Sequence, residues 1–217
     1  ITEKTDLIVV STAIEDTVYE VKKAKELGIP IIKRSELLSI IAKSKKTIAV
    51  AGTSGKSTTS AMLYQILLDA HYEPSIISGA GLTSIIKDGK IGNAAVGKGE
   101  WLIIEADESD GSVVQYEPEI GLLLNIDKDH QEIDELIDLF TIFKNNSKSL
   151  FIVNQSNTLS KSLSADIKND FGFEDKNAGY SAENFKQDGL SLTFEVLDQP
   201  FQMNSLGQHS VENATAA

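Results

Sequence analysis

The stretch Thr47-Ile-Ala-Val-Ala-Gly-Thr-Ser-Gly-Lys-Ser-Thr-Thr59 decides the fold of this chain. Its apolar first half is typical of a strand, Gly52 and Gly55 indicate a tight turn, and Lys56-Ser57 opens a segment of helical spacing. A loop between such a strand and helix gathers backbone N–H groups around a polyphosphate. The sequence therefore predicts a P-loop, with the lysine at the β- and γ-phosphates and the serine hydroxyl on Mg²⁺.

This loop is a shortened form of the general P-loop pattern. The pattern has a glycine five positions before Gly55, and Val50 stands there instead. A glycine-rich turn alone is common at strand ends, but the flanking strand and helix patterns favour phosphate binding here. The residues expected to bind ATP are Gly52, Thr53, Ser54, Gly55, Lys56, Ser57 and Thr58.

Composition narrows the class of protein. The 217 residues are 41% hydrophobic, as in a globular α/β protein, and no apolar run reaches membrane-spanning length. The net charge of −12 argues against a nucleic-acid partner, because no basic patch could neutralise a phosphate backbone. The absence of cysteine excludes disulfides and thiolate metal sites. We expect a cytoplasmic protein that acts on small molecules.

Strand-like runs alternate with helical patterns from residue 6 to residue 154. This alternation predicts an α/β fold with a doubly wound, mostly parallel sheet, which binds ligands at the carboxyl ends of its strands. A helix is expected over 15–27 and another, capped by Ser35, up to Ile41. Residues 79–81 and 89–99 are expected as loops, and the part after residue 154 as a small, mostly antiparallel β region.

Three predicted strands end in polar or charged residues. Lys56-Ser57 follows one, Glu105-Ala-Asp-Glu-Ser-Asp110 ends another, and Asn125-Ile-Asp-Lys-Asp-His130 follows a third. The carboxyl ends of parallel strands share one edge of the sheet, so we expect these side chains to meet. Glu105 directly follows four apolar residues, where an unpaired carboxylate is costly. We therefore predict that it binds Mg²⁺ together with Ser57.

The remaining polar residues of these strand ends have two interpretations each. Asp107, Glu108 and Asp110 either belong to the site or cap a helix and face solvent. For His130, its place a few residues past a buried strand and beside Asp129 favours a site role over that of a surface histidine.

Four motifs, in this order, resemble those of the Mur ligase family: Gly52-Thr-Ser-Gly-Lys-Ser-Thr-Thr59, residues 105–110, residues 125–130, and Gly207-Gln-His-Ser-Val-Glu-Asn213. The opening residues are similar to the end of the family's UDP-binding domain. The resemblance implies that residues 1–45 are the C-terminal part of a Rossmann-like UDP-substrate-binding domain and that 46–217 are the central ATP-binding domain. It also implies a longer enzyme with a further C-terminal domain, so we expect these residues alone to be inactive.

The resemblance further implies an ADP-forming amide ligase of peptidoglycan precursor synthesis, with ATP and Mg²⁺. The acidic motif is most similar to that of the branch joining L-alanine to UDP-N-acetylmuramate through an acyl phosphate. The implied catalytic residues are Lys56, Glu105 and His130, and the implied metal ligands are Ser57, Glu105 and, for a second ion, His130. His209 and Asn213 lie by the adenine in the family, whereas Ser210 replaces its usual asparagine. Ser11, Thr12 and Asn125 are expected to contact the substrate.

Two other functions stay open from the sequence. One is the related ligase that joins a murein tripeptide to UDP-N-acetylmuramate, although that enzyme usually has tyrosine where Ser109 stands. The other is a nucleotide-binding relative without catalysis. The presence of Lys56, Glu105 and His130 argues against it, because a decayed site is expected to lose some of these.

Overall fold

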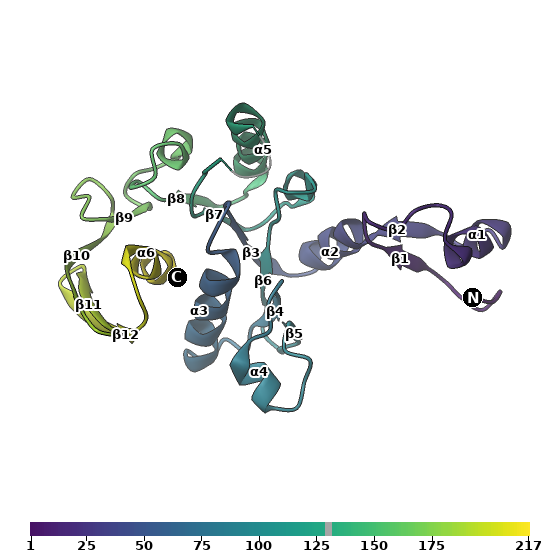
Figure 1. The fold of residues 1–217 in the computed structure, drawn as a ribbon, viewed down its shortest axis with the longest axis horizontal. Helices are drawn as coiled ribbons and strands as arrows, with labels where there is room; N and C mark the ends of the chain where they lie inside the picture. Colours follow the sequence, from purple (N-terminus) through teal and green to yellow (C-terminus); the bar gives the residue numbers. More distant parts are fainter. Residues whose placement is uncertain (129–131) are drawn as a thin grey trace.

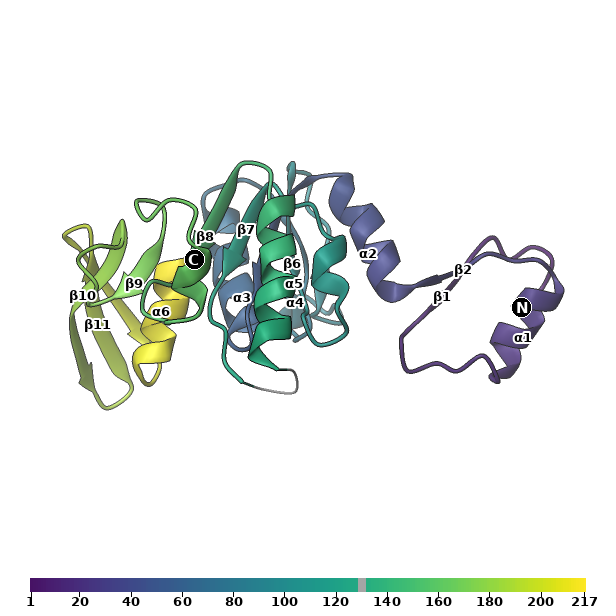
Figure 2. The same ribbon diagram turned by 90° about the horizontal axis from the view of Figure 1, so that it is seen from above.

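The computed structural model describes residues 1–128 and 132–217. Figures 1 and 2 show three parts in a row: a small N-terminal unit, a central sheet with helices on both faces, and a β-rich C-terminal part. Helix α2 connects the first part to the second (Figure 1). In the described ranges, no helix is both long and apolar enough to cross a membrane.

The elements follow the chain in this order. The helices are α1 (Tyr19–Glu26), α2 (Arg34–Lys43), α3 (Lys56–Asp69), α4 (Thr83–Lys87), α5 (Ile133–Asn146) and α6 (Gln208–Ala216), with two 3₁₀ helices, η1 (Ser112–Gln115) and η2 (Ser160–Leu163). The strands are β1 (Ile8–Val10), β2 (Ile31–Lys33), β3 (Lys46–Ala51), β4 (Ser75–Ile77), β5 (Ala94–Ala95), β6 (Trp101–Glu105), β7 (Ile120–Leu123), β8 (Leu150–Val153), β9 (Phe171–Phe173), β10 (Tyr180–Asp188), β11 (Ser191–Val196) and β12 (Gln199–Asn204).

The central sheet has the strand order β5-β4-β6-β3-β7-β8. All its pairings are parallel except that of β5 with β4. Strand β3 therefore lies in the middle, between β6 and β7. The carboxyl ends of β4, β6, β3 and β7 follow one another along a single edge, which is where a doubly wound sheet binds its ligands.

The alternation of side chains along β3 builds two cores. Ala49 and Ala51 face one side, where they pack with Phe140 and Phe143 of α5. Residues 48 and 50 face the other side, where they pack with α3. Because a parallel sheet is buried on both faces, its strands read as nearly continuous apolar runs, which is the pattern of residues 47–51.

The N-terminal unit consists of the parallel pair β1 and β2 with helix α1. Helix α2 follows directly and is fixed to the central part by hydrogen bonds. The Ser39 hydroxyl donates to the Gln115 carbonyl at 2.9 Å, and the Thr47 hydroxyl donates to the Ala42 carbonyl at 2.8 Å. The structure therefore attaches α2 firmly to the side of the central sheet.

A second sheet, in the order β12-β11-β10-β9, forms the C-terminal part together with α6. Its junction with the central sheet contains Asp170, a fully buried carboxylate. This carboxylate accepts hydrogen bonds from the Val153 backbone N–H at 2.9 Å, the Gln155 side chain at 2.7 Å and the Ser164 hydroxyl. Three donors satisfy the buried charge and join the end of β8 to the start of β9.

Several boundaries differ from the sequence-based expectations. Helix α1 begins at Tyr19 rather than Glu15, because a turn with a hydrogen bond from the Val18 N–H to the Glu15 carbonyl precedes it. Helix α2 begins before Ser35, which is buried in its first turn; Glu36 instead accepts a hydrogen bond from the Lys33 N–H at 2.6 Å.

The expected loop at 89–99 contains β5, and the small sheet pairs β9 with β10 in parallel. Both features are short, with two or three residues each, and pairings of this length leave little trace in a sequence.

Candidate functional site

The loop between β3 and α3 has the backbone of a phosphate cradle. Gly55 precedes the first residue of α3 with φ of +84°, and Gly52 has φ of +133°. A side chain on either glycine would be strained, and a Cβ on Gly55 would approach the Asn213 side-chain oxygen to 2.5 Å. No side chain caps α3, so the N–H groups of its first turn point toward the loop.

The Lys56 ammonium lies at the centre of this loop. It donates to the Gly52 carbonyl at 2.7 Å and to the two Glu108 carboxylate oxygens at 2.9 and 3.2 Å. Glu108 was one of the acidic residues with two interpretations. The structure places it inside the site, with its side chain only 8% exposed.

Ser57 and Glu105 meet as the sequence predicts. The Ser57 hydroxyl donates to one Glu105 carboxylate oxygen at 2.8 Å. The other oxygen accepts from the Ser78 hydroxyl at 2.6 Å and the Gly79 N–H at 2.7 Å. The ends of β3, β4 and β6 thus hold the carboxylate in one orientation beside the phosphate loop.

These two residues fit a Mg²⁺ ion bound together with phosphates. In the described ranges, no three His, Cys, Asp or Glu side chains gather into a complete metal site. Mg²⁺ does not require one, because it keeps several waters and is commonly held by one or two protein oxygens and by substrate phosphates. The Ser57 hydroxyl and the Glu105 carboxylate are hard oxygen donors of that kind. His130, the expected ligand of a second ion, lies outside the described residues.

Asn125 supports the loop rather than facing away from it. Its side-chain oxygen accepts hydrogen bonds from the Thr53 hydroxyl and the Ser54 N–H, both at 2.9 Å. Its side-chain nitrogen donates to the Ser54 carbonyl at 3.1 Å. The amide expected to contact substrate is therefore engaged by the two loop residues next to the glycine pair.

Helix α6 forms the other wall of the loop. His209 and Asn213 line a pocket of about 230 Å³ together with loop residues 54, 55 and 58. The motif at 207–213 and the phosphate loop are far apart in sequence and side by side here. The Ser210 hydroxyl does not line this pocket; it donates to the Leu206 carbonyl at 2.7 Å and contacts the Ser205 hydroxyl at 2.7 Å.

A second pocket, of about 330 Å³, opens on the other side of Lys56 toward α2. Lys56 and Glu105 line its inner end, and Arg34 of α2 lines it as a further cation. Its remaining wall combines apolar side chains with polar ones, among them Leu37, Ile41, Ile77, Ser78, Asn93, Asp107, Asp110 and Tyr116. Burial raises the pKa of Tyr116, so its phenol is neutral at pH 7.

Ser11 and Thr12, the other residues expected at the substrate, follow β1 in the N-terminal unit. They are not among the described residues that line the pocket beside Lys56. The structure therefore does not bring them to this part of the site.

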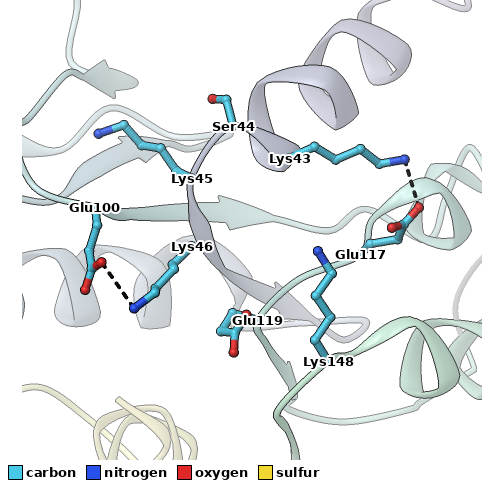
Figure 3. Close-up of a pocket in the computed structure, with 8 residues that line it drawn as sticks. All are labelled: Lys43, Ser44, Lys45, Lys46, Glu100, Glu117, Glu119 and Lys148. Carbon is cyan, nitrogen blue, oxygen red and sulfur yellow. Dashed lines mark ion pairs between the residues drawn. The ribbon is translucent and has the colours of Figure 1, made fainter.

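The opposite edge of the central sheet also has an open hollow, of about 410 Å³ (Figure 3). It lies at the amino ends of β3, β6, β7 and β8 and is lined by exposed lysines and glutamates. Lys43 pairs with Glu117 at 2.8 Å and Lys46 with Glu100 at 3.1 Å (Figure 3). Exposed pairs of this kind contribute little binding energy, and this edge has no glycine loop.

Sequence reasoning missed several residues that line the two pockets. Asn154 and Glu212, which hydrogen-bond each other at 2.8 Å, lie beside His209. Asn154 directly follows β8, so the rule that strand ends carry ligand-binding residues could have found it. Arg34 and Tyr116 have no comparable signal, because only tertiary packing brings α2 and the end of η1 to the site.

Comparison with known proteins agrees with this arrangement. Residues 50–217 match the Mur ligase middle domain, and residues 1–46 match the domain described as Mur ligase family, catalytic domain. The chain is 37% identical over 219 residues to a UDP-N-acetylmuramate–L-alanine ligase of Gloeothece citriformis, covering 97% of this chain and 43% of that protein. It is 33% identical to the ligase of the same name from Syntrophomonas wolfei, covering 99% of this chain and 49% of that protein. The chain belongs to the Mur ligase family.

Solved structures show the same fold. A UDP-N-acetylmuramate–alanine ligase of Thermotoga maritima superposes with a TM-score of 0.84 at 24% identity, covering 97% of this chain and 49% of that one. The Neisseria UDP-N-acetylmuramate:L-alanyl-γ-D-glutamyl-meso-diaminopimelate ligase gives 0.79 at 21% identity, covering 98% and 72%. The chain thus spans less than half the length of the curated relatives named above.

We expect the substitution Glu105→Gln to weaken nucleotide binding much more in the presence of Mg²⁺ than in its absence. Glutamine keeps the size of the side chain but removes the charge that attracts a hard cation. Calorimetric titration of the complete protein with ATP, in Mg²⁺ and in EDTA, measures the difference. Glu100→Gln, at the opposite edge, is the matched control and should change neither affinity. Equal losses in both buffers would contradict the assignment of Glu105 as a metal ligand.

Proposed function

We propose that this chain is part of an ATP-dependent amide ligase that joins L-alanine to UDP-N-acetylmuramate in peptidoglycan precursor synthesis, releasing ADP and phosphate. In this function, ATP phosphorylates the substrate carboxylate, and the alanine amine then attacks the acyl phosphate. The names of the most similar curated relatives support the substrates. The enzyme acts on small molecules in the cytoplasm and has no nucleic-acid partner.

One observation carries the proposal: Lys56 and Glu105 line both the phosphate loop and the pocket toward α2. A γ-phosphate bound at the loop and a carboxylate entering that pocket would reach the same two residues. Arg34 lies in the same pocket and can attract an anionic substrate. The arrangement brings donor and acceptor together, and positioning of this kind contributes on the order of 7–11 kcal/mol to bimolecular reactions.

The chain's own residues have distinct roles in this reaction. Residues 52–58 and the first turn of α3 bind the phosphates, and Lys56 neutralises charge on the transferred group. Asn125 holds the loop in shape, whereas His209 and Asn213 lie at the base end. Mg²⁺, held by Ser57 and Glu105, supplies further charge neutralisation at the phosphates.

We also propose that residues 1–45 are the end of the UDP-substrate-binding domain and that 46–217 are the central ATP-binding domain. The two family matches, which divide between residues 46 and 50, support this boundary. So does the start of β3 at Lys46, directly after α2.

The complete protein tests the proposal. It is incubated with ATP, Mg²⁺ and UDP-N-acetylmuramate, and either L-alanine or the tripeptide L-alanyl-γ-D-glutamyl-meso-diaminopimelate. We expect ADP release that depends on the muramate and a product with the mass of the alanine conjugate. Product only with the tripeptide would identify the recycling ligase instead, and ATP binding without ADP release would identify a non-catalytic relative.

A further inference from the structure

The three N–H donors of the Lys56 ammonium are already engaged by groups of the protein. One contact is the Gly52 carbonyl at 2.7 Å, and the other two are the Glu108 carboxylate oxygens at 2.9 and 3.2 Å. An ammonium group has only three donors. A phosphate oxygen that binds Lys56 must therefore take a donor from one of these partners.

This ion pair differs from the others in the described ranges by its burial. The side chains of Lys56 and Glu108 are 17% and 8% exposed, whereas those of the Lys43–Glu117 pair are 50% and 47% exposed. A surface pair is screened by water, but a buried carboxylate beside a buried ammonium interacts strongly. Competition for the lysine should therefore have a measurable effect on phosphate binding.

The surroundings strengthen this competition. Lys56 is the one lysine among the residues that line the two pockets at this edge, and Arg34 is the one arginine. Four carboxylates lie in the short segment from residue 105 to residue 110. A polyphosphate thus enters a region of negative charge in which the main cation is held by Glu108.

We propose that Glu108 is the counter-charge of Lys56 and that a polyphosphate binds by displacing it from the ammonium. This inference rests on the phosphate site of the proposed function and adds a residue that opposes binding. The carboxylate lowers the affinity for ATP while it stabilises the protein in which ATP is not bound. A residue with a merely structural role would, on removal, reduce both stability and affinity.

The test compares Glu108→Gln with the wild type in the complete protein, using ATP in EDTA. We expect the variant to bind ATP about tenfold more tightly, because glutamine leaves the ammonium free for the phosphates. Without ATP, the same variant should unfold at a lower temperature, because its buried ammonium has lost its counter-charge. Glu117→Gln removes the carboxylate of an exposed Lys–Glu pair and should change the ATP affinity less than twofold.

A double substitution checks that the effect passes through the lysine. In a Lys56→Ala background, Glu108→Gln should improve the ATP affinity less than threefold, because only longer-range repulsion remains to be relieved. If Glu108→Gln does not fold, Glu108→Asp replaces it. Its shorter side chain withdraws from the ammonium but keeps its charge, so a gain of about two- to fourfold is expected.

The outcomes separate this inference from the proposed function. Unchanged or weaker binding of ATP by the Glu108 variants would overturn the competition while leaving the phosphate site in place. Failure of both the wild type and the variants to bind ATP would overturn the phosphate site itself and the inference with it.

Discussion

Substitution of Lys56 by alanine reduces ATP turnover to below roughly 1% of the wild-type rate in the complete protein. The ammonium is the main cation of the phosphate loop, and methyl cannot replace its charge on a transferring phosphoryl group. Turnover is followed by ADP release with both substrates present. The fold is expected to persist, because α3 and β3 are held by apolar cores on both faces of the sheet.

The control for this substitution is Lys46→Ala, which removes an exposed lysine at the opposite edge of the same strand. It should leave turnover within a factor of two. Circular dichroism of both variants checks the fold. Near-normal turnover of the Lys56 variant would contradict the role assigned to this lysine.

Gly55→Ala is expected to reduce the affinity for ATP at least 100-fold. The added Cβ meets the Asn213 side-chain oxygen at 2.5 Å and a Leu124 methyl at 3.2 Å, so the loop has to shift. The positive φ of +84° adds a backbone cost of about 1–2 kcal/mol for a residue with a side chain. Because this residue begins α3, its displacement moves the N–H groups that face the phosphates.

Gly189→Ala separates strain from displacement. Gly189 also has a positive φ, +57°, but a Cβ there meets nothing within 4 Å. We expect it to lower the free energy of unfolding by about 1 kcal/mol and to leave ATP binding unchanged. Calorimetry and thermal unfolding measure both quantities. Wild-type affinity in the Gly55 variant would show that the loop tolerates the shift.

The parts of the fold that depend on repeated patterns were predictable from the sequence. The continuous apolar run at 47–50 and the one at 101–104 correctly indicated strands buried on both faces. Helix boundaries were less predictable, as Ser35 shows: it has the right residue type for a cap but lies buried inside α2. Tertiary packing of α2 on the sheet outweighed the local preference.

The site shows the same division. The pairing of Ser57 with Glu105 followed from the rule that parallel strands end at one edge. The position of Glu108 did not, because a run of acidic residues after a strand is equally compatible with exposure to solvent. Only the three-dimensional turn after β6 brings this carboxylate to the lysine. Arg34 similarly depends on where α2 packs, which no local pattern encodes.

The position of α6 against the phosphate loop has a consequence for the order in which the protein is made. The loop at 52–58 leaves the ribosome early, whereas Asn213, which lies over Gly55, is synthesised more than 150 residues later. Domains fold from the N-terminus during synthesis, so the central sheet can assemble while this wall is still lacking. A nascent chain therefore has a phosphate cradle before it has a base pocket. The ability to hold a whole nucleotide marks the completion of the C-terminal sheet and its helix.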